Sequence, residues 1–124
     1  MTDKTKPATP GATNVADVAD FDAKLAAATG KVLVEFVQED CVFCEEEAPA
    51  VDALALTCGN RATVLRVNVS KEKLKPLVER FKLEELGGTP TILYAENAAK
   101  LNAGKGVEVD PTQARRRLKC TVKW

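Results

Sequence analysis

The apolar residues of this chain gather in short runs that are separated by polar and turn-forming segments. Two of these runs, Lys31–Val37 (KVLVEFV) and residues 62–69 (ATVLRVNV), are nearly continuous, as in strands that are buried on both faces of a sheet. Residues 14–18 are a weaker candidate for a first strand. We expect Thr91–Ala95 and residues 100–102 to form a hairpin. The pattern therefore predicts a sheet with two buried central strands.

Helix-forming segments alternate with these strands. Asp20 and Gly30 have the residue types of an N-cap and of a C-terminal stop, and Asp110 is followed by Pro111 and Gln113 in the pattern of a capping box. The predicted helices cover residues 21–28, 42–57, 74–83 and 111–119. Strands that alternate with helices and end in a hairpin indicate an α/β fold, with a central mixed sheet flanked by helices on both faces.

The N-terminal residues differ in composition from the rest of the chain. Residues 1–13 carry Thr, Pro, Gly and charge but hardly any apolar side chain, so we expect a disordered segment there. At 124 residues the chain suits one domain, which we place at residues 14–124. No basic stretch followed by an apolar one opens the sequence, so we expect no secretion signal in it.

Charge and the absence of histidine restrict the possible chemistry. The 18 basic residues balance 18 acidic ones, so net charge indicates neither nucleic acid nor an anionic membrane as a partner. Without histidine, the chain has no His-based triad, no Cys–His dyad and hardly any route to a catalytic zinc site. The remaining candidates are carboxylates, hydroxyls, amines and the 4 cysteines.

Cys41 and Cys44 form a C-x-x-C motif where a strand passes into a helix. At a helix N-terminus the first cysteine faces unpaired backbone N–H groups and the positive end of the helix dipole, which stabilise a thiolate. The second cysteine lies three residues later on the same face and can attack a mixed disulfide. The alternative is half of a structural zinc site, completed by Cys58 and Cys120.

Further residues accompany this motif. The strand VLVEF leads into CVFC, a proline follows Cys44 by five residues, and a GGTPT segment precedes the strand at Thr91–Ala95. An acidic residue interrupts the first central strand and a basic residue interrupts the second. These accompanying residues are Glu35, Pro49, Arg66, Thr89 and Pro90. In this combination, residues 14–119 resemble the thioredoxin family.

The resemblance implies a thioredoxin-like fold and thiol–disulfide exchange with protein thiols and disulfides. Cys41 would form the mixed disulfide with the partner and Cys44 would resolve it. Glu35 falls where the family has a buried acid behind the second cysteine, and it would handle the proton. Thr89 and Pro90 fall in the cis-proline loop, whose backbone would present an edge to the partner's extended chain. No cofactor and no metal are implied, and we expect a monomer.

Some positions depart from the usual thioredoxin pattern. Asp40 replaces a tryptophan, Val42 and Phe43 replace Gly-Pro, and Thr89 replaces an aliphatic residue before the proline. These changes resemble bacterial extracytoplasmic thioredoxin-like and Dsb-type proteins. They favour the bacterial periplasm over the cytoplasm, which stays possible, and they leave the physiological partner and the direction of electron transfer open.

Cys58 and Cys120 would each end a helix. In the thioredoxin fold these two helices cover one sheet face and run away from the active site, so a structural Cys58–Cys120 disulfide is geometrically possible. Two unrelated buried thiols are the alternative. A bond would indicate an oxidising compartment.

Several alternatives remain for the other site residues. Glu35 could point to solvent from an edge strand, Arg66 could be a surface residue instead of its partner, and Pro90 could follow an ordinary trans bond. Acidic residues around Cys41 would oppose the stabilisation of its thiolate by the helix dipole. A functional alternative is a redox-inert binding module that keeps the cysteines only as a structural disulfide.

Overall fold

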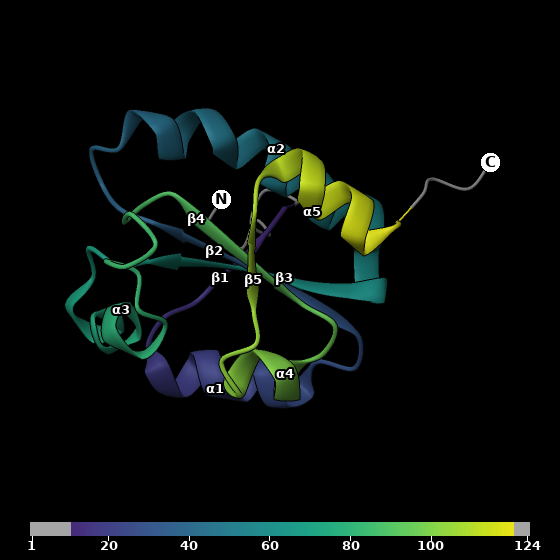
Figure 1. Ribbon diagram of the computed structural model, residues 1–124, viewed down its shortest axis with the longest axis horizontal. Coiled ribbons are helices and arrows are strands. Elements are labelled where there is room, and N and C mark those ends of the chain that lie inside the picture. Colours follow the sequence, from purple (N-terminus) through teal and green to yellow (C-terminus); the bar gives the residue numbers. More distant parts are fainter. Residues whose placement is uncertain (1–10, 121–124) are drawn as a thin grey trace, which may run out of the picture.

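The computed structural model describes residues 11–120, which fold around a five-stranded sheet of order β1-β3-β2-β4-β5 (Figure 1). Strands β1, β3 and β2 run parallel, whereas β4 and β5 are antiparallel to their neighbours. The bounds are β1 Thr13–Asn14, β2 Lys31–Val37, β3 Ala62–Asn68, β4 Thr91–Ala95 and β5 Val107–Val109. The sheet is mixed, and the predicted fold class is confirmed.

The helices form one layer on each side of this sheet (Figure 1). Helices α2 and α5 lie on one side, and α1, α3 and α4 lie on the other. Within residues 11–120, no helix is both long enough and apolar enough to cross a membrane. The bounds are α1 Val18–Ala27, α2 Val42–Cys58, α3 Pro76–Arg80, α4 Ala98–Asn102 and α5 Pro111–Leu118, with short 3₁₀ turns at Gly59–Arg61 and Glu72–Leu74.

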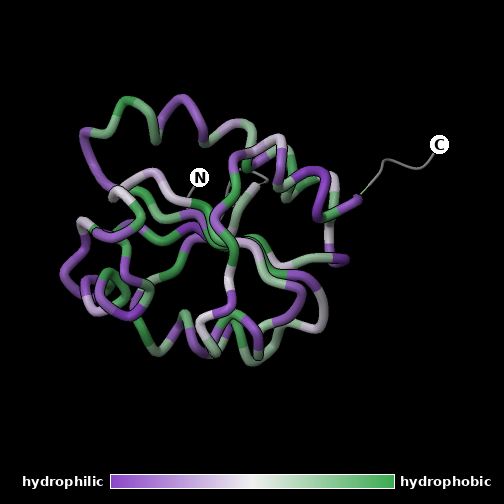
Figure 2. Tube along the Cα trace, in the orientation of Figure 1, coloured by the Kyte–Doolittle hydropathy of each residue, from purple (hydrophilic) through white to green (hydrophobic). Residues whose placement is uncertain are grey.

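The central strand β2 divides its side chains between the two layers. Successive residues of a strand point to opposite faces. Val32, Val34 and Phe36 are fully buried in the core beneath α1 and α3, whereas Leu33 packs in the second core beneath α2 and α5. In Figure 2 the apolar strands lie at the centre of the molecule. By the same alternation Glu35 lies on the α2 side of the sheet, beneath the helix that carries both cysteines of the motif.

The N-terminal boundary lies earlier than the sequence predicted. Thr13 pairs with Leu65 in β1, and the backbone N–H of Ala12 donates to the Asp52 carboxylate at 2.9 Å. Residues 11–13 therefore belong to the domain and not to the N-terminal segment, because they complete an edge of the sheet. The rest of that expected disordered segment, residues 1–10, lies outside the described residues.

Two predicted helices begin or break elsewhere. Helix α1 begins at Val18, and Asp17 is its N-cap, because the Asp17 carboxylate accepts from the backbone N–H of Asp20 at 2.7 Å. The prediction that Asp20 is the cap was therefore wrong. The helix predicted over residues 74–83 is split, since Pro76 opens α3 after the separate 3₁₀ turn. The capping box at Asp110, in contrast, is confirmed.

The predicted hairpin was also wrong in its second strand. Residues 100–102 are the end of helix α4, because the Asn97 side chain caps that helix by accepting from the backbone N–H of Lys100 at 2.8 Å. The strand that pairs with β4 is β5, which begins five residues after α4 ends. Gly104 has φ 78°, a left-handed conformation that favours glycine, and it turns the chain between the two elements.

Helices α2 and α5 end side by side, far from the C-x-x-C motif. A disulfide joins Cys58 to Cys120 there, with their Cα atoms 5.0 Å apart. Cys58 is almost fully buried. The two cysteines meet because both helices cover the same sheet face and run in the same direction (Figure 1).

We predict that this second disulfide forms in the oxidised protein and stabilises it. The bond closes a loop with a sequence separation of 62 residues. The double variant Cys58→Ala/Cys120→Ala lacks the bond that closes this loop. In the chain-entropy account its free energy of unfolding should be lower by about 4 kcal/mol. Urea unfolding measures this loss. Thiol titration of the oxidised, denatured protein should find no free thiol, and two free thiols per chain would contradict the bond.

Candidate active site

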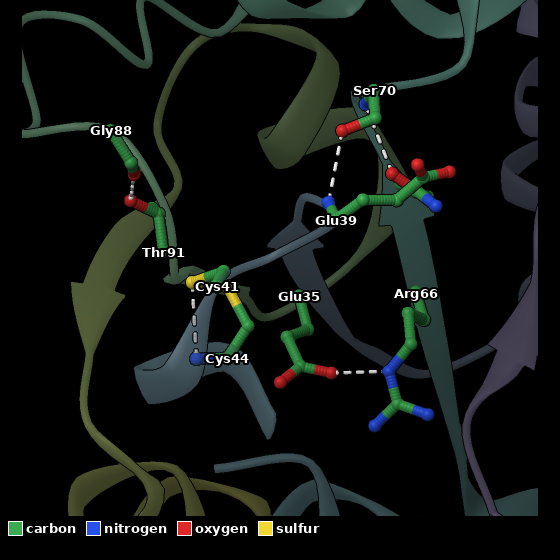
Figure 3. The surroundings of a disulfide bond; sticks show 9 residues. Glu35, Glu39, Cys41, Cys44, Arg66, Ser70, Gly88 and Thr91 are labelled. Atoms are coloured by element: carbon green, nitrogen blue, oxygen red, sulfur yellow. Dashed lines mark hydrogen bonds and ion pairs between the residues drawn. A yellow bond between two sulfur atoms is a disulfide. The ribbon is translucent and has the colours of Figure 1, made fainter. Parts of the chain in front are cut away.

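Cys41 and Cys44 lie at the junction between β2 and α2. Cys41 is the N-cap of α2, and its Sγ accepts a hydrogen bond from the backbone N–H of Cys44 at 3.1 Å (Figure 3). A disulfide joins the two residues, with their Cα atoms 5.2 Å apart. Asp40 has φ 57°, so the chain turns through a left-handed residue before it enters the helix. This turn places the first sulfur at the end of the helix axis.

The two sulfurs differ in exposure. Cys41 is partly exposed, whereas Cys44 has a relative exposure of only 4%. After reduction, a Cys41 thiolate would lie within reach of the first N–H groups of α2 and of the positive end of its dipole. Glu39, Asp40 and Glu45 around it are exposed, so water and salt screen their opposing charge. The local geometry therefore favours Cys41 as the reactive sulfur.

Glu35 is fully buried at 0% relative exposure, and it faces Arg66 on the next strand. The parallel register of β2 and β3 places these two residues opposite each other, and Arg66 Nε lies 2.6 Å from Glu35 Oε1. Figure 3 shows Glu35 between the Cys44 turn and Arg66. The burial of Glu35 agrees with what the resemblance implied, and of the two alternatives left open for Arg66 the structure has the pair with Glu35.

Arg66 also holds helix α2 to the sheet. Its Nη1 lies 3.0 Å from Asp52 Oδ1, and its Nη2 donates to the carbonyl of Ala48 at 3.2 Å. The sequence prediction did not identify Asp52 as a partner. Its signal was present, because Asp52 follows Cys44 by eight residues and therefore lies on the same, inward face of α2.

Glu47 is a further acidic residue that the sequence prediction did not separate from the solvated helix surface. It follows Cys44 by three residues on α2 and is only partly exposed. Burial raises the pKa of Glu47 to about 7, and two effects of the neighbouring Glu35 carboxyl add to it: Glu35 accepts a hydrogen bond from the protonated Glu47, and its charge disfavours a second carboxylate. Helical spacing from Cys44 could have indicated its inward position.

The Thr89–Pro90 segment lies beside these residues. Its peptide bond is cis, and the preceding Gly87 and Gly88 have φ 97° and 90°, conformations that favour glycine. The Thr91 hydroxyl donates to the Gly88 carbonyl and closes the turn (Figure 3). Pro90 and Glu47 line the same groove of about 380 Å³, so the loop adjoins Glu47.

The zinc alternative required four sulfurs in one place. The structure instead pairs them at opposite ends of α2, and the fourteen residues from Cys44 to Cys58 span about 21 Å of helix. Among the residues that the structure describes, no group of His, Cys, Asp and Glu could hold a metal ion.

The family assignment rests on most of the chain. The family model described as Thioredoxin matches residues 12–115. The chain belongs to the thioredoxin family. It is 29% identical over 96 residues to thioredoxin-1 of Drosophila yakuba, a match that covers 77% of this chain and 85% of that protein.

Solved structures agree with this thioredoxin fold. The germline-specific thioredoxin Deadhead of Drosophila melanogaster superposes with a TM-score of 0.68 at 20% identity, covering 86% of this chain and 96% of that one. Oxidised thioredoxin O1 of Arabidopsis thaliana gives a TM-score of 0.68 at 16% identity, with 91% and 99% coverage. At these identities the likeness concerns the fold.

Membership of the thioredoxin family and the intact Cys41–Cys44 pair make this protein a thiol–disulfide oxidoreductase. The family acts on protein disulfides. A redox-inert binding module, the alternative considered above, would need neither a sulfur at the helix N-terminus nor a buried carboxyl group beneath it.

We predict that Arg66 is required for stability because it neutralises Glu35. In Arg66→Met, the Glu35 carboxylate would be buried without its counter-charge, and the free energy of unfolding at neutral pH should fall by about 3 kcal/mol. The double variant Glu35→Gln/Arg66→Met should recover most of this loss. Urea unfolding of both variants checks the prediction, and a double variant no more stable than Arg66→Met would disprove the cause.

Proposed function

We propose that Cys41 is the nucleophile of protein disulfide exchange and that Cys44 is the resolving residue. The observation that supports this most directly is the hydrogen bond from the Cys44 N–H to Cys41 Sγ at the start of α2. This contact supports Cys41 as the sulfur that the helix terminus would stabilise as a thiolate. The other sulfur is buried beneath the first turn.

The proposed reaction passes through one covalent intermediate. The Cys41 thiolate attacks a partner disulfide, forms a mixed disulfide and releases the first partner sulfur as a thiolate. Cys44 then loses its proton and attacks Cys41 Sγ, which releases the second partner sulfur and re-forms the Cys41–Cys44 bond. The reverse sequence oxidises a partner dithiol. Glu35, buried on the α2 side of β2, is the proposed acceptor and donor of the Cys44 proton.

The surface around Cys41 offers contacts to a protein partner. Val42 and Phe43, between the two cysteines, have relative exposures of 64% and 71%. Such exposed apolar side chains can pack against a partner chain. The backbone at Thr89 and Pro90 is the proposed edge for the partner's extended segment. All of these residues come from one chain, and we infer that the protein works as a monomer.

We predict that the two cysteines can be distinguished by trapping. In Cys44→Ser the mixed disulfide on Cys41 cannot be resolved, so the variant should accumulate covalent complexes with an oxidised protein such as insulin. Cys41→Ser should form few, because its remaining Cys44 thiol is shielded. Non-reducing electrophoresis and mass spectrometry measure the complexes.

Limited alkylation of the fully reduced protein provides the control for this prediction. At limiting reagent, peptide mapping should find Cys41 labelled before Cys44. Preferential labelling of Cys44, or trapping by Cys41→Ser alone, would reverse the assigned roles.

A separate prediction concerns the proposed proton acceptor. Glu35→Gln keeps the shape of the side chain but cannot accept the Cys44 proton, so disulfide exchange near neutral pH should slow by about tenfold or more. The free energy of unfolding should not decrease, because the variant removes a buried charge while Arg66 keeps Asp52 as a partner. Insulin reduction and urea unfolding measure the two effects. An unchanged rate would show that Glu35 has no part in proton transfer.

A further inference from the structure

Two buried carboxyl oxygens beneath the active site face no conventional hydrogen-bond donor. Within residues 11–120, Glu35 Oε2 and Glu47 Oε1 are both shielded from solvent and have no donor among the hydrogen bonds of the structure. The other oxygen of Glu35 is occupied by Arg66. A buried carboxylate oxygen without a donor is costly. A proton between the two groups would satisfy both oxygens at once.

The two carboxyl groups are placed for such sharing. Glu35 belongs to β2 and Glu47 to α2, and their side chains are close enough to hydrogen-bond to each other. Two neighbouring carboxylates resist simultaneous ionisation, so one of them keeps its proton to a higher pH. The raised pKa of Glu47, about 7, agrees with this arrangement.

The surrounding charges decide which group holds the proton. Arg66 contacts Glu35 directly, so it favours the ionised form of that residue. Asp52 takes part of the Arg66 charge, and Asp110 at the start of α5 adds negative potential at Glu47. The proton therefore belongs mainly to Glu47, whose O–H can donate to Glu35. The charged groups that face the pair, from β3, α2, β5 and the α5 N-cap, are Arg66, Asp52, Glu108 and Asp110.

Glu47 also has a route to water. Besides its buried oxygen, its side chain lines the groove next to the Thr89–Pro90 loop. Pro90, Glu108 and Asp110 border this groove together with Glu47. Glu35, in contrast, is fully buried and has no surface of its own.

We propose that Glu35 and Glu47 share one proton, and that Glu47 is a positioning residue through which Glu35 exchanges protons with the solvent. The inference deepens the proposed function, on which it rests, by assigning the exit path of the Cys44 proton. The nucleophile, the resolving cysteine and Glu35 keep the roles given above.

The proposed step balances in protons and electrons. Before resolution the pair holds one proton, on Glu47. Cys44 gives its proton to Glu35, and the resulting thiolate forms the bond to Cys41 Sγ, while the electron pair of the broken bond leaves on the partner sulfur. Glu47 then releases its own proton to water in the groove, and the pair again holds one proton. The partner thiolate takes up a proton from the solvent.

The shared proton can be measured directly in the oxidised wild-type protein. Carboxyl ¹³C NMR should show a Glu47 resonance that titrates with a midpoint near pH 7 and a coupled change at the Glu35 resonance. Glu47→Gln should remove the inflection near pH 7, and Glu46→Gln, an exposed neighbour on the same helix turn, should retain it. If no glutamate resonance of the wild type titrates above pH 6, the shared proton does not exist.

The kinetic test uses the aromatic disulfide of Ellman's reagent. Attack by Cys41 releases the first coloured thiolate, and resolution by Cys44 releases the second, so stopped-flow absorbance separates the two steps. In Glu47→Gln the second phase should be about tenfold slower at pH 6, where the wild-type pair holds the shared proton, with a smaller difference at pH 8, where wild-type Glu47 has already lost it. The first phase should stay within about twofold.

Two comparisons complete the test. Glu46→Gln should leave both phases unchanged, and equal slowing by Glu46→Gln and Glu47→Gln would show a general charge effect and overturn the proposal. In the Glu35→Gln background, Glu47→Gln should cause no further slowing, because Glu47 acts through Glu35. A first phase that comes from Cys44 would refute the assigned cysteine roles instead, and the NMR titration would still decide whether the proton is shared.

Discussion

The ion pairs of Arg66 connect the parts of the molecule on which its chemistry depends. One guanidinium contacts Glu35 on β2, Asp52 on α2 and the Ala48 carbonyl of the same helix, while Arg66 itself belongs to β3. These contacts fix the position of helix α2 relative to the central strands β2 and β3. They also allow a carboxyl group to remain fully buried beneath a redox-active disulfide, because its charge is neutralised within the fold.

Much of this arrangement follows from patterns that a single sequence displays. The two central strands were predictable because their apolar runs are nearly unbroken. Whether the acidic and the basic residue that interrupt them face each other was left open by the sequence, and the parallel register of β2 and β3 decides it. The C-x-x-C motif, the cis-proline loop and the capping box at Asp110 are local signals as well. Their geometry depends on residues that are close in the sequence, so it can be predicted without knowing the rest of the fold.

The features that sequence reasoning missed depend on competition or on distant contacts. Asp17 and Asp20 are equally good caps by residue type, and in the structure Asp17 is the extended residue whose carboxylate accepts from the backbone N–H of Asp20. Residues 100–102 are helical because the Asn97 side chain caps α4, and the apolar pattern that suggested an immediate hairpin does not show this cap. Glu47 sits within a run of three glutamates, where composition indicates a solvated surface, and its inward position becomes clear only from the phase of α2 relative to the sheet.

The Cys58–Cys120 bond also determines how this chain could be pulled through a narrow opening. With the bond intact, residues 58–120 form a closed covalent ring, whereas the residues before Cys58 form a tail that has no cross-link once Cys41–Cys44 is reduced. An unfoldase or translocation pore that draws the chain from its N-terminal side could thread this tail in single file. At Cys58 the pore would have to admit two segments of the chain side by side. Threading beyond α2 would therefore depend on the width of the pore or on prior reduction of the Cys58–Cys120 bond.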